Sequence, residues 1–250
     1  MKNLINGFIM ALSMFTILPV PYKAWKDDAV RHMLKLYPLV GAVVGIIIYA
    51  VFRLTDYFNL SIILVSAITM VTPFLITGML HLDGFMDVSD ALLSRRDREE
   101  KVRILKDPNT GAFSVNSLGI LFIINFAAIY TLVENKSNII GIIIIPIISR
   151  SLMGLMLLRK ESMKESSLGS YFKKGTGKTD ILILYVFLII ASFIFIFLGL
   201  KFISVPLGMI AVAILSVKKS IKELGGMSGD IAGYGLVLSE VIGILILAII

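Results

Sequence analysis

The feature that most constrains this chain is a series of apolar runs, each about 17 to 22 residues long. A helix of that length crosses roughly 30 Å of hydrocarbon. Inside hydrocarbon every backbone hydrogen bond must be satisfied within the protein, and a helix does so within one segment. The composition agrees, because 57% of the residues are hydrophobic, 16% are charged and the mean hydropathy is +0.92. We therefore expect an all-α, polytopic integral membrane protein, with residues 1–250 in a single membrane-embedded domain.

Seven runs have the length of a membrane span. They cover residues 36–52, 60–80, 113–133, 139–158, 181–200, 202–217 and 231–250. Residues 4–20 are an eighth candidate, but polar residues such as Asn6 and Thr16, and the prolines that follow, fit an interfacial or re-entrant helix equally well. The sequence thus predicts seven or eight hydrophobic helices. In the first of them, Gly41 and Gly45 form a pair of small residues typical of close helix packing.

The basic residues divide the connections between these runs into two classes. The long connections at 21–35, 81–112, 159–180 and 218–230 carry four, six, six and three Lys or Arg residues, which is 19 of the 24. Cytoplasmic loops of membrane proteins carry such an excess. We therefore expect a charged cytoplasmic face and a location in a prokaryotic cytoplasmic (inner) membrane. The net charge of +7 is then a topology signal that also suits anionic lipid, and it requires no nucleic acid as a partner.

The residue types available limit any metal site. The chain has no Cys and only two His residues, so a thiolate or multi-histidine centre is excluded. The 17 acidic residues instead provide oxygen ligands, which Mg²⁺ prefers. Fourteen of them fall on the same side as the basic connections. A topology signal does not require these carboxylates.

Three aspartates follow the second apolar run at helical spacing. Asp83, Asp87 and Asp90 stand at positions i, i+4 and i+7, which places them within an arc of roughly 60° on one helix face. Leu82, Phe85, Met86 and Leu93 cover another side of the same helix. Crowded carboxylates of this kind are stabilised by a divalent cation shared with substrate phosphates. A solvated acidic helix end is the alternative interpretation.

Basic residues follow the acidic stripe directly. They are Arg95, Arg96, Arg98, Lys101, Arg103 and Lys106. Phosphoryl transfer uses this combination, because a metal ion and nearby cations together neutralise the charge on the phosphate oxygens. The alternative is a basic helix whose side chains extend to the membrane surface.

Two further features lie near or within the last apolar run. The segment Gly225-Gly226-Met227-Ser228-Gly229-Asp230 precedes it, where Ser228 or Asp230 is able to cap the helix and free backbone N–H groups are able to bind an anion. Glu240 lies about 15 Å further along, within the membrane, where a charge needs a partner. Arg150 in the fourth long apolar run is the natural candidate.

The chain resembles the cobalamin synthase family, the adenosylcobinamide-GDP ribazoletransferases, over nearly its whole length. The matching segments are Leu18-Pro19-Val20-Pro21, Tyr37-Pro38-Leu39-Val40-Gly41, the run from Gly78 through His81-Leu82-Asp83-Gly84 to Asp90, Arg96-Asp97-Arg98, Lys106-Asp107, Gly111, Ser149-Arg150, Leu168-Gly169, Phe172, Gly177-Lys178, Gly225-Gly226, Ser228-Gly229-Asp230 and Glu240. The His-Leu-Asp-Gly run is the most specific of them.

The resemblance implies a transfer reaction. The 3'-hydroxyl of alpha-ribazole, or of its 5'-phosphate, attacks the cobinamide-side phosphorus of adenosylcobinamide-GDP and expels GMP, with Mg²⁺ as the cofactor. The partners expected are these two substrates and the lipid bilayer, and a homo-oligomer is compatible with the sequence.

The resemblance also suggests roles for individual residues. Asp83 and Asp87 are assigned to the metal, Asp90 to the metal or to general-base catalysis, and His81 is a second candidate base. Phosphate or substrate contacts are assigned to Arg95, Arg96, Arg98, Lys106, Arg150, Lys178, Ser228, Asp230 and Glu240. Of these, Glu240 is expected to act in binding or in positioning the last helix rather than in the chemistry.

Two other functions remain open at this stage. A CDP-alcohol phosphotransferase of phospholipid synthesis uses similar chemistry, but its Asp-Gly-x-x-Ala-Arg motif is absent, since Asp83-Gly84 is followed by Phe85-Met86-Asp87-Val88. A membrane transporter would place its ionisable groups near the middle of the bilayer, whereas here nearly all fall on one side.

Overall fold

A computed structural model describes residues 2–20, 26–135, 138–164, 171–173 and 175–250. Two parts of the segments named above lie outside these ranges, Pro21 and Leu168-Gly169. The basic residues Lys23, Lys136 and Lys174 lie outside them as well. Within them the chain is helical, and strand-like pairing is confined to one isolated bridge between Ser162 and Met227. The predicted all-α fold is therefore confirmed.

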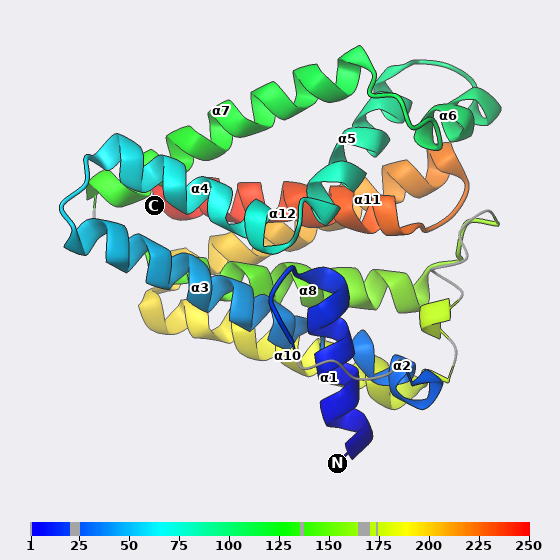
Figure 1. Ribbon diagram of the computed structural model, residues 1–250, viewed down its shortest axis with the longest axis horizontal. Coiled ribbons are helices and arrows are strands. Elements are labelled where there is room, and N and C mark those ends of the chain that lie inside the picture. Colours follow the sequence, from blue (N-terminus) through cyan, green and yellow to red (C-terminus); the bar gives the residue numbers. More distant parts are fainter. Residues whose placement is uncertain (1, 21–25, 136–137, 165–170, 174) are drawn as a thin grey trace.

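The helices follow one another along the chain as in Figure 1. They are α1 (Lys2–Phe15), α2 (Asp27–Met33), α3 (Tyr37–Tyr57), α4 (Ile62–Ile76), α5 (Leu80–Leu93), α6 (Arg98–Leu105), α7 (Ala112–Asn135), α8 (Gly141–Arg159), α10 (Lys178–Leu198), the 3-10 turn η1 (Leu200–Ile203), α11 (Ser204–Leu224) and α12 (Gly229–Ile249).

Six helices among the described residues are long and apolar enough to cross a membrane: α3, α7, α8, α10, the η1–α11 unit and α12. The bent pair α4 and α5 adds a seventh if it counts as one span. The six spans match six of the predicted runs, and the remaining run, 60–80, covers α4 and the bend that follows it. The eighth candidate forms α1, which has 14 residues, is not among the candidate spans and runs across the long helices in Figure 1.

The predicted span 60–80 is interrupted. Helix α4 ends at Ile76, and α5 continues at 90° to it. Gly78 and Met79 between them adopt left-handed backbone conformations, with φ of +58° and +62°. Two consecutive residues in this region of backbone space turn the chain sharply, so the right-angled bend is made within a few residues. The bend takes the acidic stripe out of line with the spanning helices and lays it across one end of the bundle.

Helix α8 forms the centre of the bundle, and α3 packs closely against it. A Cβ atom on Gly41 would lie 2.2 Å from the carbonyl oxygen of Pro146, and one on Gly45 would lie 2.4 Å from that of Ile143. The two helix backbones therefore approach to a distance that only glycine permits. The predicted packing role of Gly41 and Gly45 is confirmed.

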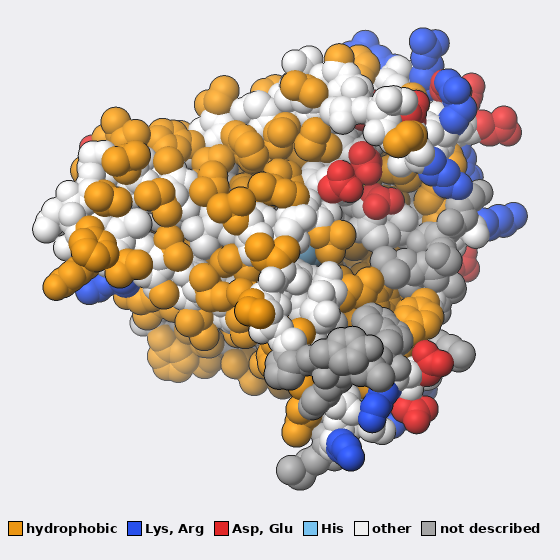
Figure 2. All heavy atoms as spheres, in the orientation of Figure 1, with side chains coloured by type: hydrophobic (Ala, Val, Ile, Leu, Met, Phe, Trp, Pro, Cys, Tyr) orange, Lys and Arg blue, Asp and Glu red, His pale blue; other side chains and the backbone are white. Residues whose placement is uncertain are grey.

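Three contacts bring the four long connections to the same end of the bundle. Lys101 pairs with Glu223 at 2.6 Å, and Lys35 pairs with Asp180 at 2.5 Å. The backbone N–H of Met163 donates to the carbonyl oxygen of Met227 over 2.9 Å. Figure 2 shows acidic and basic side chains gathered at this end, which we call the charged end. The predicted sharing of one side by these connections is confirmed.

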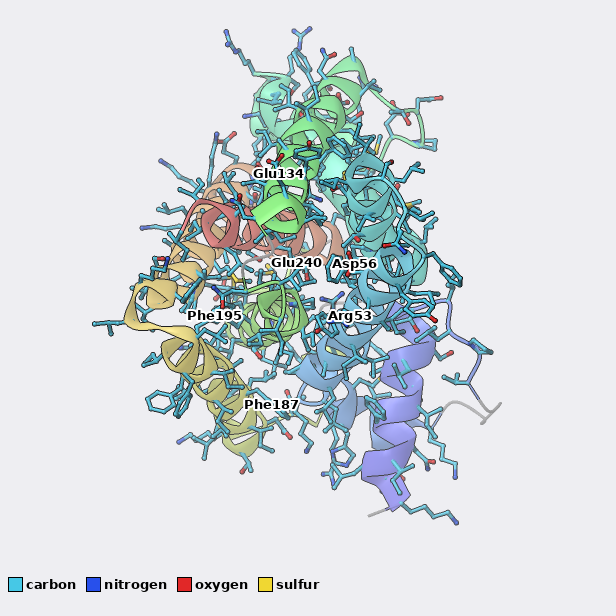
Figure 3. All side chains as sticks on the ribbon, turned by 90° about the vertical axis from the view of Figure 1, so that its left-hand side faces the viewer. Arg53, Asp56, Glu134, Phe187, Phe195 and Glu240 are labelled. Atoms are coloured by element: carbon cyan, nitrogen blue, oxygen red, sulfur yellow. The ribbon has the colours of Figure 1, made fainter. Side chains whose placement is uncertain are left out.

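The opposite end holds few charges. Figure 3, viewed from that end, shows Arg53 and Asp56 on α3 and Glu134 on α7 near the viewer. Lys201 donates a hydrogen bond to the backbone oxygen of Ile250, so the last residue of the chain also lies there.

Candidate active site

Helix α5 presents the three predicted aspartates at the charged end. Asp83 is exposed, and Asp87 and Asp90 are half-buried, while Leu82 and Phe85 on the other face are buried in the core. Figure 2 shows a group of acidic side chains over α5. The predicted stripe is therefore present, with one correction: Leu93 was expected on the buried side and is 45% exposed, because α5 ends there against solvent.

A close crossing of α5 and α12 brings a fourth aspartate to this site. A Cβ on Gly84 would lie 2.9 Å from the Cα of Asp230, and one on Gly233 would lie 3.0 Å from the carbonyl oxygen of His81. Glycine at both positions lets the two backbones touch. Asp230, in the first turn of α12, thus lies beside the α5 aspartates, although 140 or more residues separate them in sequence.

The carboxylates at this crossing influence one another. Helix α5 lies at the charged end, outside the long helices, and partial burial together with nearby negative charge raises the pKa of the Asp87 carboxyl to about 6. The charges responsible belong to Asp83, Asp230 and Asp90, in decreasing order. Among the described residues no basic side chain forms an ion pair with these aspartates. The cluster therefore carries negative charge that the described protein atoms leave uncompensated.

Asp90 is placed differently from the other members of the stripe. Its Oδ1 accepts a hydrogen bond from the backbone N–H of Ser114 over 3.3 Å, and its carboxylate lies against Gly111, where a Cβ would come within 2.0 Å. Asp90 thus satisfies a free N–H group at the start of α7. This contact accounts for Gly111 and gives Asp90 a structural task in addition to the predicted one.

The carboxylate oxygens of the acidic cluster are ligands of the type that a hard cation such as Mg²⁺ prefers. In the part of the chain that the structure describes, no three His, Cys, Asp or Glu side chains come close enough together to hold a metal ion by themselves. Mg²⁺ does not require such a cage, because it is usually bound through one or two carboxylates together with substrate phosphates and water. Asp83, Asp87 and Asp230 fit that pattern.

The predicted cationic group lies in and around α6, which is fixed to the end of α11. The Lys101–Glu223 pair joins the two helices, and the Arg98 guanidinium lies over Gly225, where φ is +100° and a Cβ would come within 1.7 Å of Nη2. Arg95, Arg96 and Lys106 are exposed. All four of these predicted phosphate-binding residues are exposed, and Arg98 differs from the other three in lying against the turn at Gly225.

The glycine-rich turn before α12 is built into the same end. A Cβ on Gly226 would lie 2.6 Å from the Met163 backbone, so the turn and the segment around Ser162 are in direct contact. Ser228 accepts a hydrogen bond from the backbone N–H of Ile231 over 3.2 Å. Of the two predicted cap residues, Ser228 is the one that caps α12, and its hydroxyl also donates to Asp230 Oδ2 over 3.4 Å.

A cavity of about 120 Å³ opens beside the acidic cluster. Asp83 and Asp230 stand on its wall, together with the rings of Phe15, Tyr37 and Phe172. His81, the second candidate base, also lines this cavity and is buried, with its Nε2 2.6 Å from the Tyr37 hydroxyl. His81 and two members of the acidic cluster, Asp83 and Asp230, therefore line the same cavity.

Three predicted substrate residues lie elsewhere. Arg150 is buried in α8, and its Nη1 donates to Glu240 Oε1 over 2.7 Å, which confirms the predicted pairing of these residues. Figure 3 shows Glu240 inside the ring of long helices. Lys178 is exposed at the start of α10, which lies across the molecule from α5 in Figure 1. The structure does not bring these three side chains into the acidic cluster.

Sequence reasoning missed several residues of this end. Phe15 and Met153, which line the cavity, look like ordinary core residues, and only their convergence marks them. The buried Lys35–Asp180 pair gave no local signal because 145 positions separate its members. Tyr37 and Phe172 belong to segments that carry the family resemblance, and that signal pointed to them without giving a role.

Comparisons with known proteins identify the family of this chain. The family model described as cobalamin-5-phosphate synthase matches residues 7–248. A curated relative from Clostridium botulinum (strain Alaska E43) named adenosylcobinamide-GDP ribazoletransferase is 50% identical over 246 residues, covering 98% of this chain and 97% of its own. Relatives with the same name from Clostridium perfringens (strain SM101) and Clostridioides difficile (strain 630) are 45% and 34% identical, covering 100% and 94% of this chain and the same shares of their own. No solved structure gives a significant match. The chain belongs to the cobalamin-5-phosphate synthase family.

Proposed function

We propose that this chain is a magnesium-dependent adenosylcobinamide-GDP ribazoletransferase that joins alpha-ribazole, or its 5'-phosphate, to adenosylcobinamide-GDP in cobalamin biosynthesis. The observation that carries the proposal is the crossing of α5 and α12, which sets Asp83, Asp87 and Asp230 together beside a cavity. The full-length likeness to relatives named for this activity supports it.

The reaction exchanges one phosphoester bond for another. The ribose 3'-oxygen forms a bond to the cobinamide-side phosphorus, and the bond from that phosphorus to the bridging oxygen of the diphosphate breaks. The bridging oxygen leaves with GMP. The proton of the attacking hydroxyl passes to a carboxylate, and Asp230 on the cavity wall is the candidate acceptor.

The protein's other residues position the diphosphate. Asp83 and Asp87 would hold Mg²⁺, which when bound neutralises charge on the phosphate oxygens and on the departing GMP. Arg98, whose guanidinium lies over Gly225, would offer a guanidinium fork to a nonbridging oxygen. The exposed Arg95, Arg96 and Lys106 add positive charge that attracts an anionic substrate.

We also propose a cellular location for this protein. The basic connections that share the charged end favour the cytoplasmic side of a prokaryotic inner membrane. The active site would then face the compartment that supplies nucleotides. The apolar helices hold the single transferase domain in the bilayer, a location that suits a large amphipathic corrinoid substrate.

One assay tests the proposal. Purified protein is incubated with adenosylcobinamide-GDP and alpha-ribazole, with Mg²⁺ or with EDTA, and GMP and the completed cobamide are measured. We expect equal amounts of both products with Mg²⁺ and neither with EDTA. Substituting CDP-diacylglycerol and an alcohol as substrates tests the rival phosphotransferase. Product from that pair alone would refute the proposal.

A further inference from the structure

The cavity beside the acidic cluster differs from the rest of the charged end in its lining. Apart from Asp83, Asp230 and the hydrogen-bonded pair of Tyr37 and His81, its walls are apolar, and they come from α1, α3, α5, α8, α12 and the short segment at Tyr171–Phe172. Phe15 on its wall packs against the other two rings, with centroids 4.3 Å from Tyr37 and 6.1 Å from Phe172. We propose that this cavity binds the heteroaromatic base of the ribazole substrate, an inference that rests on the proposed function.

The size of the cavity suits a ring system and no more. Pockets that enclose a whole drug-sized ligand occupy about 300–1,000 Å³. A volume of about 120 Å³ therefore accepts one part of a substrate, and a corrin macrocycle is far too large for it. Flat aromatic walls favour a flat aromatic occupant, because rings gain stability from offset or edge-to-face contacts.

The part of the cavity away from Asp83 and Asp230 favours the ribazole base over guanine. The Tyr37 hydroxyl and His81 Nε2 satisfy each other at 2.6 Å, and Phe15, Met153 and Leu157 offer no hydrogen bond. Guanine has several donors and acceptors on its edge, and each one buried without a partner costs about 1–3 kcal/mol. A benzimidazole-type base attached to ribose has one free ring nitrogen, so its burial is much less unfavourable.

The position of the cavity also fits the chemistry. Asp83 and Asp230 stand on its wall, between the aromatic interior and the acidic cluster. A base inside the cavity would hold its ribose at this wall. The attacking hydroxyl would then lie next to the carboxylates that bind the metal and accept the proton, and this is the orientation that transfer requires.

The experiment narrows the cavity from two sides. Leu157→Phe adds a ring from α8, and Met14→Phe adds one from α1, where Met14 is half-buried and tolerates a larger side chain. Leu158→Phe is the matched control, because Leu158 is the next residue of α8 and does not line the cavity. Equilibrium dialysis of each purified protein gives Kd for the ribosides of benzimidazole and 5,6-dimethylbenzimidazole, and for adenosylcobinamide-GDP.

We expect both cavity variants to raise the Kd of the dimethylbenzimidazole riboside about tenfold or more, and that of the smaller riboside less. The Kd of adenosylcobinamide-GDP, which also reports correct folding, should not change, and Leu158→Phe should match the wild type. Unchanged riboside affinity in both variants, or a weaker affinity for adenosylcobinamide-GDP instead, would overturn the inference. If wild-type protein binds the riboside but releases no GMP in the activity assay, the proposed function is refuted. The Kd values of the variants then decide by themselves whether the cavity binds the base.

Discussion

Arg150 on α8 donates a hydrogen bond from Nη1 to Glu240 Oε1 on α12 over 2.7 Å, inside the helix bundle. Ser149 donates to the same oxygen over 2.6 Å. The Arg150 guanidinium also lies 5.7 Å from the centre of the Tyr37 ring, and the Tyr37 hydroxyl contacts His81. A series of adjacent side chains therefore runs from this ion pair in the interior of the bundle to the wall of the cavity beside the acidic cluster.

Removing the acid of this pair should destabilise the fold without removing the chemistry. Glu240→Ala leaves a buried guanidinium without a counter-ion, and such a change costs about 3–5 kcal/mol of stability. Glu240→Gln keeps an acceptor oxygen and should cost less. Thermal unfolding in detergent measures both, with the substitution Glu134→Gln at the opposite end as the control. Complete loss of turnover in a stable Glu240→Gln protein with intact substrate binding would instead assign Glu240 to the chemistry.

The contact between α5 and α12 provides a second test. Gly84→Ala places a Cβ 2.9 Å from the Asp230 backbone, so the two helices must separate by several tenths of an ångström. We expect GMP release to fall at least about tenfold, because catalysis is sensitive to small displacements of its groups.

Gly119→Ala is the control for this substitution. Gly119 is also in a helix, but a Cβ there meets nothing within 4 Å. We expect normal turnover from that variant, since alanine favours the helix and creates no clash. Equal activity of Gly84→Ala and Gly119→Ala would mean that the close crossing does not position the active site.

The aspartates at the crossing are expected to bind the metal. Asp83→Asn and Asp87→Asn are nearly isosteric, and each removes one negative ligand, so the Mg²⁺ concentration at half-maximal GMP release should rise about tenfold. Excess Mg²⁺ should restore part of the activity. Glu99→Gln, an exposed acid on α6, should behave as the wild type. An unchanged Mg²⁺ midpoint and normal turnover in both aspartate variants would remove these residues from the site.

The orientation of the charged end in the membrane is tested by labelling. The chain has no cysteine, so each introduced thiol is unique. Ser220 is fully buried, so a thiol placed there would not be accessible to a labelling reagent. Glu99 and Lys219 are exposed at the charged end, and Asp56 is exposed at the opposite end. In intact cells an impermeant reagent should label Asp56→Cys and leave Glu99→Cys and Lys219→Cys unlabelled. The reverse pattern would place the charged end outside.

The sequence predicted local features well because they depend on short-range periodicity. The apolar runs matched the spanning helices, and the spacing of Asp83, Asp87 and Asp90 identified the stripe on α5. The bend at Gly78 and Met79 was not foreseen, since the apolar run continues to Leu80 and hydropathy does not register backbone conformation. The pairing of Arg150 with Glu240 was anticipated because two charges in hydrocarbon need each other.

The sequence by itself thus determined the helical membrane fold, the common end of the long connections and the acidic and basic groups that form the site. Only the tertiary structure decided which of these groups meet. Glycine contacts set Asp230 beside α5 and Arg98 over Gly225, and Asp90 turned to the start of α7. Long-range packing makes these choices, and residues such as Phe15 and Phe172 acquire a common cavity only when distant helices come together.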